Sequence, residues 1–367
     1  MFIQKIWSAE IISTPDKANI DYYNHPIGSG PFQFKYRKND EKIVLASNNQ
    51  YYNKCPSLNE VVFTYQPDKE KAWTRLLSGA TDIVQEISPK NYEIMKQYEK
   101  QFYIDQYPLK YYSIMLYNTH CPLFSDLRIR QALSYAIDKK YIVDHILNGY
   151  AKIAVGPMGV DSPFRNPAIK PFPYDPQQSI KLLRQIGWNY EEKDRYLCKD
   201  GKIFEFNLLV PKEYQIEKTV AQFIKVCLND IGIKMNIRAI PLDELSEKYN
   251  MNDEFQAVLT EFPSAYNSPE YLKEIWSSCA SGRSRAGCFS QPDIDALLGK
   301  IIKAKDPAQT KNYMYKVDAL ITTLQPGTFL FHKTAIDAMS KRFYLPFPFT
   351  LSHPGIFRLQ FVSLAKK

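Results

Sequence analysis

Apolar and polar residues alternate along the first third of the chain with the spacing of short strands. Phe32, Phe34 and Tyr36 are separated by single polar residues, which is the period of a strand buried on one face. Pro31 directly precedes this run. Segments rich in β-branched or aromatic residues predict further strands at 42–47, 61–66, 102–107 and 111–118.

The starts of helices can be located from residues that cap them. Asp68 precedes a helical pattern that ends at Gly79. An Asp or Ser directly before a proline is a stronger start signal, because its side chain accepts a hydrogen bond from the first turn and proline suits the first helical position. This signal predicts helices that begin after Ser88, Asp175 and Asp306.

The middle of the chain has the apolar spacing of buried helix faces. Ile129, Leu133 and Ile137 recur every four residues, so one stripe of this helix should be buried. Asp138 then caps a second expected helix, which Gly149 ends.

The second half alternates helices with strands. A helix with apolar residues on one face ends at Gly232, and residues 233–240 that follow it alternate like a strand. A strand is expected at 255–262, a helix from about Asp293, and a short strand near 328–331. Strands that alternate with helices predict an α/β protein, here in two lobes.

Composition supports a folded chain and excludes several classes of protein. The 367 residues are 45% apolar and 23% charged, so wholesale disorder is excluded. No stretch reaches the ~18 clean apolar residues of a membrane span. The net charge is +8. From Ile321 onward the sequence contains six basic residues and one acidic residue. Because these charges are spread out, a solvated basic surface is favoured over an anionic partner.

Six cysteines in a chain of this length do not indicate a disulfide scaffold. None forms a C-x-x-C pair and no histidine lies at zinc-finger spacing, so no structural metal is expected. Cys279 and Cys288 share a short polar loop and are either free thiols or a disulfide. The N-terminus as written has no secretory signal.

No catalytic set is visible. The five histidines are scattered, and His332 within an apolar run is expected to be a hydrogen-bonded strand residue rather than a ligand. No G-x-S-x-G elbow occurs. Gly28-Ser29-Gly30-Pro31 lacks both phosphate-binding patterns, so we interpret it as a turn that enters a strand. We therefore expect a protein that is not an enzyme and has no cofactor.

Five blocks in order along the chain match one known pattern. They are HPIGSGPFQF at 25–34, NNQYYNKCPSLNEVVF at 48–63, LSGATDI at 77–83, PLFSDLRIRQALSYAIDKKYIV at 122–143 and YDPQQSIKLLRQIGW at 174–188. Together they resemble the family 5 extracellular solute-binding proteins, the peptide- and nickel-type receptors of ABC importers. The block at 122–143 is the most specific match.

This resemblance implies a fold of the type II periplasmic-binding-protein class, with two lobes joined by hinge strands. In the family, far more chain precedes the Gly28 turn than is present here, so lobe I is expected to be incomplete and the chain N-terminally shortened, by engineering or naturally. Residues 1–118 and 328–367 would form the remainder of lobe I. Residues 119–327 would form lobe II.

The resemblance also points to the ligand site. Peptide receptors of this family have a strand that ends in an aromatic residue and, three residues later, an Asp that binds the peptide ammonium. Here Phe262 keeps the aromatic residue and Tyr266 and Asn267 match, but Ala265 replaces the Asp. The loss of such a contact weakens binding by ~1.5–3 kcal/mol, unless another acid such as Glu261 reaches the site.

The family positions therefore assign Phe262, Tyr266 and Asn267 to an interlobe cleft, with core packing as the alternative for Phe262. Arg283 and Arg285 could meet an anionic group, although a solvated loop is the simpler interpretation. The implied function is capture of a peptide-like or related small solute by a periplasmic or extracellular, lipid-anchored monomer that serves ABC permease subunits. It would bind no nucleic acid and would meet the membrane only through the permease. A cytoplasmic solute-sensing or repurposed module is the alternative.

Overall fold

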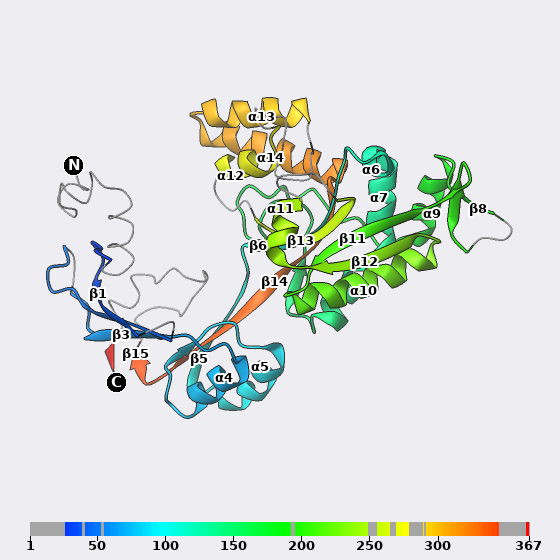
Figure 1. Ribbon diagram of the computed structural model, residues 1–367. Coiled ribbons are helices and arrows are strands. Elements are labelled where there is room, and N and C mark those ends of the chain that lie inside the picture. Colours follow the sequence, from blue (N-terminus) through cyan, green and yellow to red (C-terminus); the bar gives the residue numbers. More distant parts are fainter. Residues whose placement is uncertain are drawn as a thin grey trace. The chain divides into compact units, whose positions relative to one another are not determined.

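The computed structural model describes residues 26–38, 41–52, 55–191, 195–248, 255–264, 269–278, 289, 291–344 and 365–366. The chain forms two compact units (Figure 1). Unit 1 consists of Met1–Tyr107 and Ala335–Lys367, and unit 2 is the continuous segment Pro108–Thr334. The boundaries predicted after residue 118 and before residue 328 both fall inside unit 2.

Unit 2 is built around a mixed sheet. Its strands lie in the order β12-β11-β13-β6-β14, and β7 also pairs with β14. The pairs β11–β12 and β11–β13 are parallel, whereas β13–β6, β6–β14 and β14–β7 are antiparallel. The strands are β6 (Tyr111–Tyr117), β7 (Ala151–Ile153), β11 (Glu205–Pro211), β12 (Lys234–Ile240), β13 (Ala257–Pro263) and β14 (Gly327–Ser340). A separate small sheet contains β8 (Asn189–Tyr190), β9 (Leu197–Lys199) and β10 (Lys202–Ile203).

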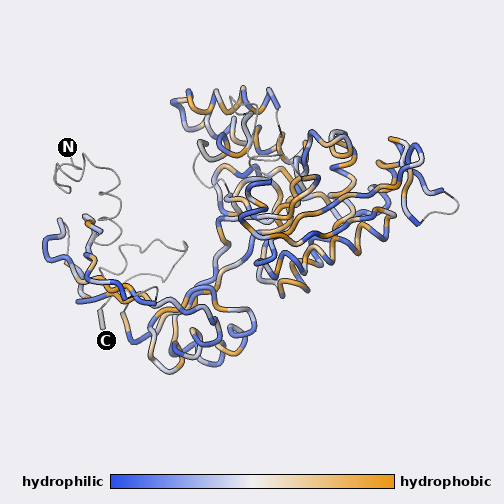
Figure 2. Tube along the Cα trace, viewed as in Figure 1, coloured by the Kyte–Doolittle hydropathy of each residue, from blue (hydrophilic) through white to orange (hydrophobic). Residues whose placement is uncertain are grey.

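Helices cover both faces of this sheet. One buried cluster joins the sheet to α7, α9 and α10, and the other joins it to α12, α13 and α14. Hydrophobic residues are concentrated along the central strands (Figure 2). The helices of unit 2 are α6 (Pro122–Ser125), α7 (Leu127–Ala136), α8 (Lys139–Tyr141), α9 (Pro176–Arg184), α10 (Gln215–Asp230), α11 (Leu242–Glu247), α12 (Pro269–Trp276), α13 (Pro292–Lys303) and α14 (Pro307–Leu324).

The capping signals correctly predicted where helices begin. Asp68 Oδ1 accepts hydrogen bonds from the backbone N–H groups of Glu70 and Lys71 at 2.9 and 3.2 Å. The side chains of Ser88, Asp175 and Asp306 likewise accept a bond from the first turn of the helix that follows each of them. One expected helix differs, because the segment after Asp138 is α8 followed by a π-helical turn, η2 (Ile142–Ile146).

Unit 1 contains a small antiparallel sheet in the order β1-β2-β3. The expected turn at 28–31 leads directly into β1, where Asn48 Nδ2 donates to the Gly30 carbonyl at 2.9 Å. The elements of unit 1 are β1 (Phe32–Lys38), β2 (Lys42–Ser47), β3 (Glu60–Thr64), α4 (Lys69–Leu77), β4 (Ile83–Val84), α5 (Pro89–Met95), the 3-10 turn η1 (Lys96–Tyr98), β5 (Phe102–Pro108), β15 (Phe343–Tyr344) and β16 (Ala365–Lys366).

The strand expected near 328–331 is much longer in the structure. β14 runs from Gly327 to Ser340, and its first part belongs to unit 2 and its last part to unit 1. The polar residues His332, Lys333 and Asp337 interrupt the apolar pattern in the sequence. Each of them has a partner on a neighbouring element, so the strand continues through them.

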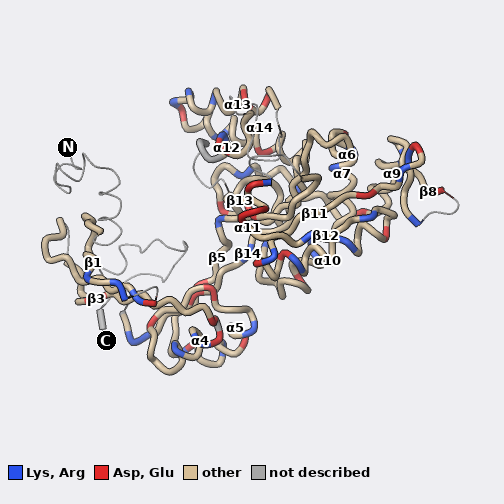
Figure 3. The backbone as a smooth tube through the Cα atoms, in the orientation of Figure 1, with Lys and Arg blue, Asp and Glu red and all other residues tan. Residues whose placement is uncertain are grey.

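Charged residues of both signs are interspersed along the described chain (Figure 3). Among the described helices, none is long and apolar enough to cross a membrane.

Candidate functional site

Of the predicted ligand residues, Phe262 lies in the described part of the chain. It is in β13 and only 5% exposed, and its ring lies 6.3 Å from that of Tyr112 and 6.2 Å from that of Trp276. Tyr266, Asn267, Arg283 and Arg285 lie outside the described residues, as do Ala265, Cys279 and Cys288. The side chain of Phe262 therefore packs in an aromatic cluster, as the alternative interpretation expected.

This aromatic cluster connects β13 with three further elements. The Tyr112 ring of β6 lies 5.3 Å from the Phe329 ring of β14. The Trp276 ring of α12 lies 6.1 Å from the same Phe329 ring. The Phe289 ring is 6.1 Å from Trp276. Burial raises the pKa of the Tyr112 hydroxyl, which is therefore protonated at any physiological pH. The cluster packs the end of β13 into the buried core of unit 2.

The end of β13 lies where the chain enters and leaves unit 2. The Ser264 N–H donates to the Lys110 carbonyl at 2.8 Å, and Pro263 pairs with Tyr111. The Leu109 N–H donates to the Lys333 carbonyl at 2.7 Å. We call this region, formed by residues 109–111, 262–264 and 332–333, the crossover edge. It brings Phe262 next to both chain crossings of the unit boundary.

His332 lies at the crossover edge as a buried strand residue. Its Nδ1 is 3.0 Å from the Tyr111 carbonyl oxygen, and its ring packs edge-on against Tyr112. Burial lowers the pKa of this imidazole to about 4, so it is neutral at pH 7. The expectation of a hydrogen-bonded strand histidine is confirmed. Among the described residues, no three His, Cys, Asp or Glu side chains are grouped to hold a metal ion.

A partly buried ion cluster includes Lys333 of the crossover edge, on the face covered by α10. Lys333 Nζ lies 2.7 Å from Glu217 Oε1 in the first turn of α10 and 2.8 Å from Glu261 Oε1 in β13. The Glu217 side chain is 2% exposed, whereas those of Lys333 and Glu261 are 22% and 26% exposed. We call these three residues the Lys333 cluster. It contains two carboxylates and one ammonium.

The environment of the Lys333 cluster shifts the pKa values of its members. Burial raises the pKa of Glu261, and Glu217 adds to this rise while Lys333 opposes it. Burial alone would lower the pKa of Lys333, but the two neighbouring carboxylates outweigh it, so the lysine pKa is raised and the side chain stays charged. Glu261 thus lies beside the crossover edge, but its carboxylate is already paired with Lys333.

Little in the sequence predicts the Lys333 cluster. The position of Glu261 near the end of a strand suggests it as a substitute acid, but no motif points to Glu217 or to its pairing with Lys333. The three residues come from a helix and two strands that are far apart in the chain. A lysine within the apolar run of β14 was the one local signal, because a buried charge requires a partner.

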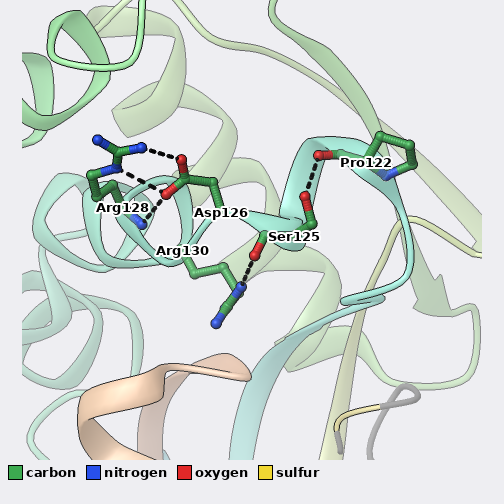
Figure 4. Close-up of polar contacts among 5 residues, drawn as sticks. All are labelled: Pro122, Ser125, Asp126, Arg128 and Arg130. Carbon is green, nitrogen blue, oxygen red and sulfur yellow. Dashed lines mark hydrogen bonds and ion pairs between the residues drawn. The ribbon is translucent and has the colours of Figure 1, made fainter.

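The most specific motif of the sequence has a structural role. Asp126 caps α7 by accepting from the Arg128 N–H at 2.8 Å, and its carboxylate also pairs with the Arg128 guanidinium at 2.7 Å (Figure 4). Arg128 holds the pKa of Asp126 below its usual value. This exposed pair fixes the turn between α6 and α7.

Arg130 in the same motif is 4% exposed, and its guanidinium donates to backbone carbonyls. It donates to Phe124 and Ser125 at the end of α6, and to Leu324 and Gln325 at the end of α14. These carbonyls lack partners within their helices. Arg130 therefore joins two helix ends, and the motif builds unit 2 without touching the crossover edge.

The comparisons with known proteins agree with this architecture. Residues 3–284 match the family model described as bacterial extracellular solute-binding proteins, family 5 middle. The chain belongs to this family. The resemblance to this family predicted from the sequence is therefore confirmed.

Two curated relatives show the range of names within this family. The oligopeptide-binding protein AppA of Bacillus subtilis is 26% identical over 86% of this chain and 58% of its own length. The nickel-binding periplasmic protein of Escherichia coli is 24% identical over 77% of this chain and 55% of its own length. The chain thus spans little more than half of these relatives.

The fold is that of the type II periplasmic binding proteins of this family. The solved structure of AppA from Bacillus subtilis with a nonapeptide superposes with a TM-score of 0.76, covering 98% of this chain and 71% of that one at 23% identity. The prediction of a two-lobed α/β binding-protein fold is confirmed.

Proposed function

We propose that this protein is the solute-capturing component of an ABC importer. Membership of family 5 over residues 3–284 carries this proposal, because relatives in the family are named for the peptide or nickel that they bind. A binding protein of this kind closes two lobes on its solute, which must contact both lobes to stabilise the closed state. No feature of the residues that the structure describes favours the alternative of a cytoplasmic sensor.

We place one wall of the solute site at the crossover edge. Phe262 supports this, because its ring is anchored by Tyr112 and Trp276 and lies next to both chain crossings. Tyr266 and Asn267 follow it in the sequence and would extend the wall. Arg283 and Arg285 are proposed to meet an anionic group of the solute.

The solute is proposed to be a peptide-like compound or related small molecule that does not depend on a free α-ammonium. Ala265 stands where the family's peptide receptors have an acid. Glu261, the nearest described substitute, is paired with Lys333 at 2.8 Å. An ammonium brought to this edge would have to compete with an ammonium that is already tethered there.

The function is proposed to be carried out outside the cytoplasm, as in the rest of the family, by a lipid-anchored monomer that delivers its solute to permease subunits. Catalysis is not part of the proposal. The chemistry of the described crossover edge, with a neutral histidine and a lysine paired with two carboxylates, suits binding.

Calorimetric titration with short peptides in matched free-amine and N-acetylated forms tests this proposal. We expect saturable binding of at least one member, with no preference for the free amine. Phe262→Ala should weaken that binding at least tenfold, whereas Tyr52→Ala, at a residue 84% exposed in unit 1, should leave it unchanged. A free amine that bound tens of times more tightly than its acetylated partner would contradict the proposed solute class.

A further inference from the structure

The carboxylate of Asp337 is buried between the two strands through which unit 1 continues into unit 2. Asp337 lies in β14 and is completely buried. Its Oδ2 accepts a hydrogen bond from the Tyr107 hydroxyl of β5 at 2.8 Å, and its Oδ1 accepts one from the Glu86 N–H at 2.9 Å. Tyr107 is the last residue of unit 1 before the first crossing, and Asp337 follows shortly after the second. One carboxylate therefore joins both connecting strands.

The same carboxylate holds a strained turn. Glu86 has a φ of 54°, a left-handed backbone conformation that is unfavourable for a residue with a side chain. Its N–H is bound by Asp337, and the next N–H, that of Ile87, donates to the Ile336 carbonyl at 2.8 Å. Two residues earlier, Val84 of β4 pairs with Ala338. The turn is thus fastened to β14 at three successive points, and Asp337 is the one that can change its charge.

The surroundings of Asp337 make its negative charge unfavourable. Burial is the largest effect and raises its pKa to about 6, while the bonds from Glu86 and Tyr107 oppose this rise. The charged groups that act on it from β5 and from the turn, Asp105 and the Glu86 side chain, are both acidic and raise the pKa further. Burial and Asp337 likewise raise the pKa of the Tyr107 hydroxyl, which remains a donor.

We propose that Asp337 is the proton-binding site of a pH-sensitive clamp that fastens β5, β14 and the Glu86 turn together within unit 1. When the turn opens, the carboxyl reaches water and regains its ordinary affinity for protons. The closed clamp binds the proton more tightly than the open one, so protonation favours closure. The clamp is therefore tightest below about pH 4, loosens as the pH rises from there to about 6, and changes little above that value. This device is independent of the proposed solute and of its site.

Amide hydrogen exchange of the intact protein, read at Glu86 and Ile87 and corrected for intrinsic rates, tests the clamp. With a pKa of about 6 in the closed state and about 3.9 when exposed, protection of these two amides should fall about tenfold from pH 5 to pH 8. Asp337→Asn should make their protection independent of pH. The control Asp82→Asn, at an exposed carboxylate of the same unit, should keep the tenfold change.

Two results would overturn the clamp. One is protection at Glu86 and Ile87 that changes less than twofold over this range in the wild type. The other is an equal pH response in Asp337→Asn. If that variant does not fold, a carbon-13 titration of the Asp337 carboxyl in the wild type decides, because a midpoint near 4 contradicts the proposal and one near 6 supports it. None of these measurements involves a solute, so they can fail or succeed separately from the proposed function.

Discussion

Two arginines of one motif, Arg128 and Arg130, show how burial decides the contribution of a side chain. Arg128 makes an exposed ion pair with Asp126, whereas Arg130 is enclosed and binds four backbone carbonyls. Burial lowers the pKa of Arg130. It remains charged, because an arginine pKa starts above 12, and it keeps its bonds at every physiological pH.

Replacing these two arginines should have very different effects. Arg130→Met leaves helix-end carbonyls of α6 and α14 without partners and should lower the free energy of unfolding by about 3 kcal/mol or more. The matched control Arg128→Met should cost at most about 1 kcal/mol. Urea unfolding of both variants measures the difference. Equal losses in the two variants would contradict the assigned roles.

The Lys333 cluster supports a second prediction for single residues. Lys333→Met leaves Glu217 and Glu261 facing each other without a cation, and should lower the free energy of unfolding by about 3–5 kcal/mol. The double variant Lys333→Met with Glu217→Gln removes the buried charge together with its partner and should recover part of this loss. A double variant that is no more stable than Lys333→Met alone would show that the cluster is not the cause.

At the scale of elements, local signals predicted most helices and failed where burial depends on distant neighbours. The caps at Asp68, Ser88, Asp175 and Asp306 were found because a helix start is encoded by a few adjacent residues. The length of β14 was not found. Its polar residues have partners on β5, β6 and α10. The sequence of the strand does not predict these partners.

The candidate site shows the same limit. Phe262 could be assigned by its place in a motif, but its neighbours Tyr112 and Trp276 come from other elements and carried no signal of their own. Glu217, Glu261 and Lys333 meet only once the sheet is formed and α10 covers it. Clusters of this kind depend on the order of strands in the sheet, which brings together residues that are far apart in the chain.

Two glycines test the packing of these elements. A Cβ at Gly327, the first residue of β14, would lie 2.8 Å from the Ile114 side chain and from the Met115 carbonyl oxygen of β6. Gly327→Ala should therefore lower the free energy of unfolding by about 1–3 kcal/mol. Gly299 is in α13 with nothing within 4 Å of a Cβ, so Gly299→Ala should instead raise it by about 0.5–1 kcal/mol.

Thermal and urea unfolding of the two glycine variants separate these effects. The prediction requires shifts of opposite sign. If Gly327→Ala were as stable as the wild type, β6 and β14 could not approach each other as closely as the structure shows.

At the scale of the whole molecule, the family and the fold were predictable because several motifs occurred in order along the chain. The solute was not predictable, because members of one family are named for ligands as different as oligopeptides and nickel. The wall proposed at Phe262 would supply shape, and the Lys333 cluster beside it would supply charge. Neither names the solute by itself.

Native mass spectrometry of the gently purified protein tests the central claim, that this chain captures a small solute, most directly. We predict a fraction of molecules that carry one additional small molecule, which is released on denaturation and rebinds saturably when returned to the stripped protein. Phe262→Ala should reduce this fraction while leaving the thermal midpoint high enough to show a folded protein. The claim would be contradicted if the protein, once freed of bound molecules, bound neither the material released from it on denaturation nor any peptide or metal chelate.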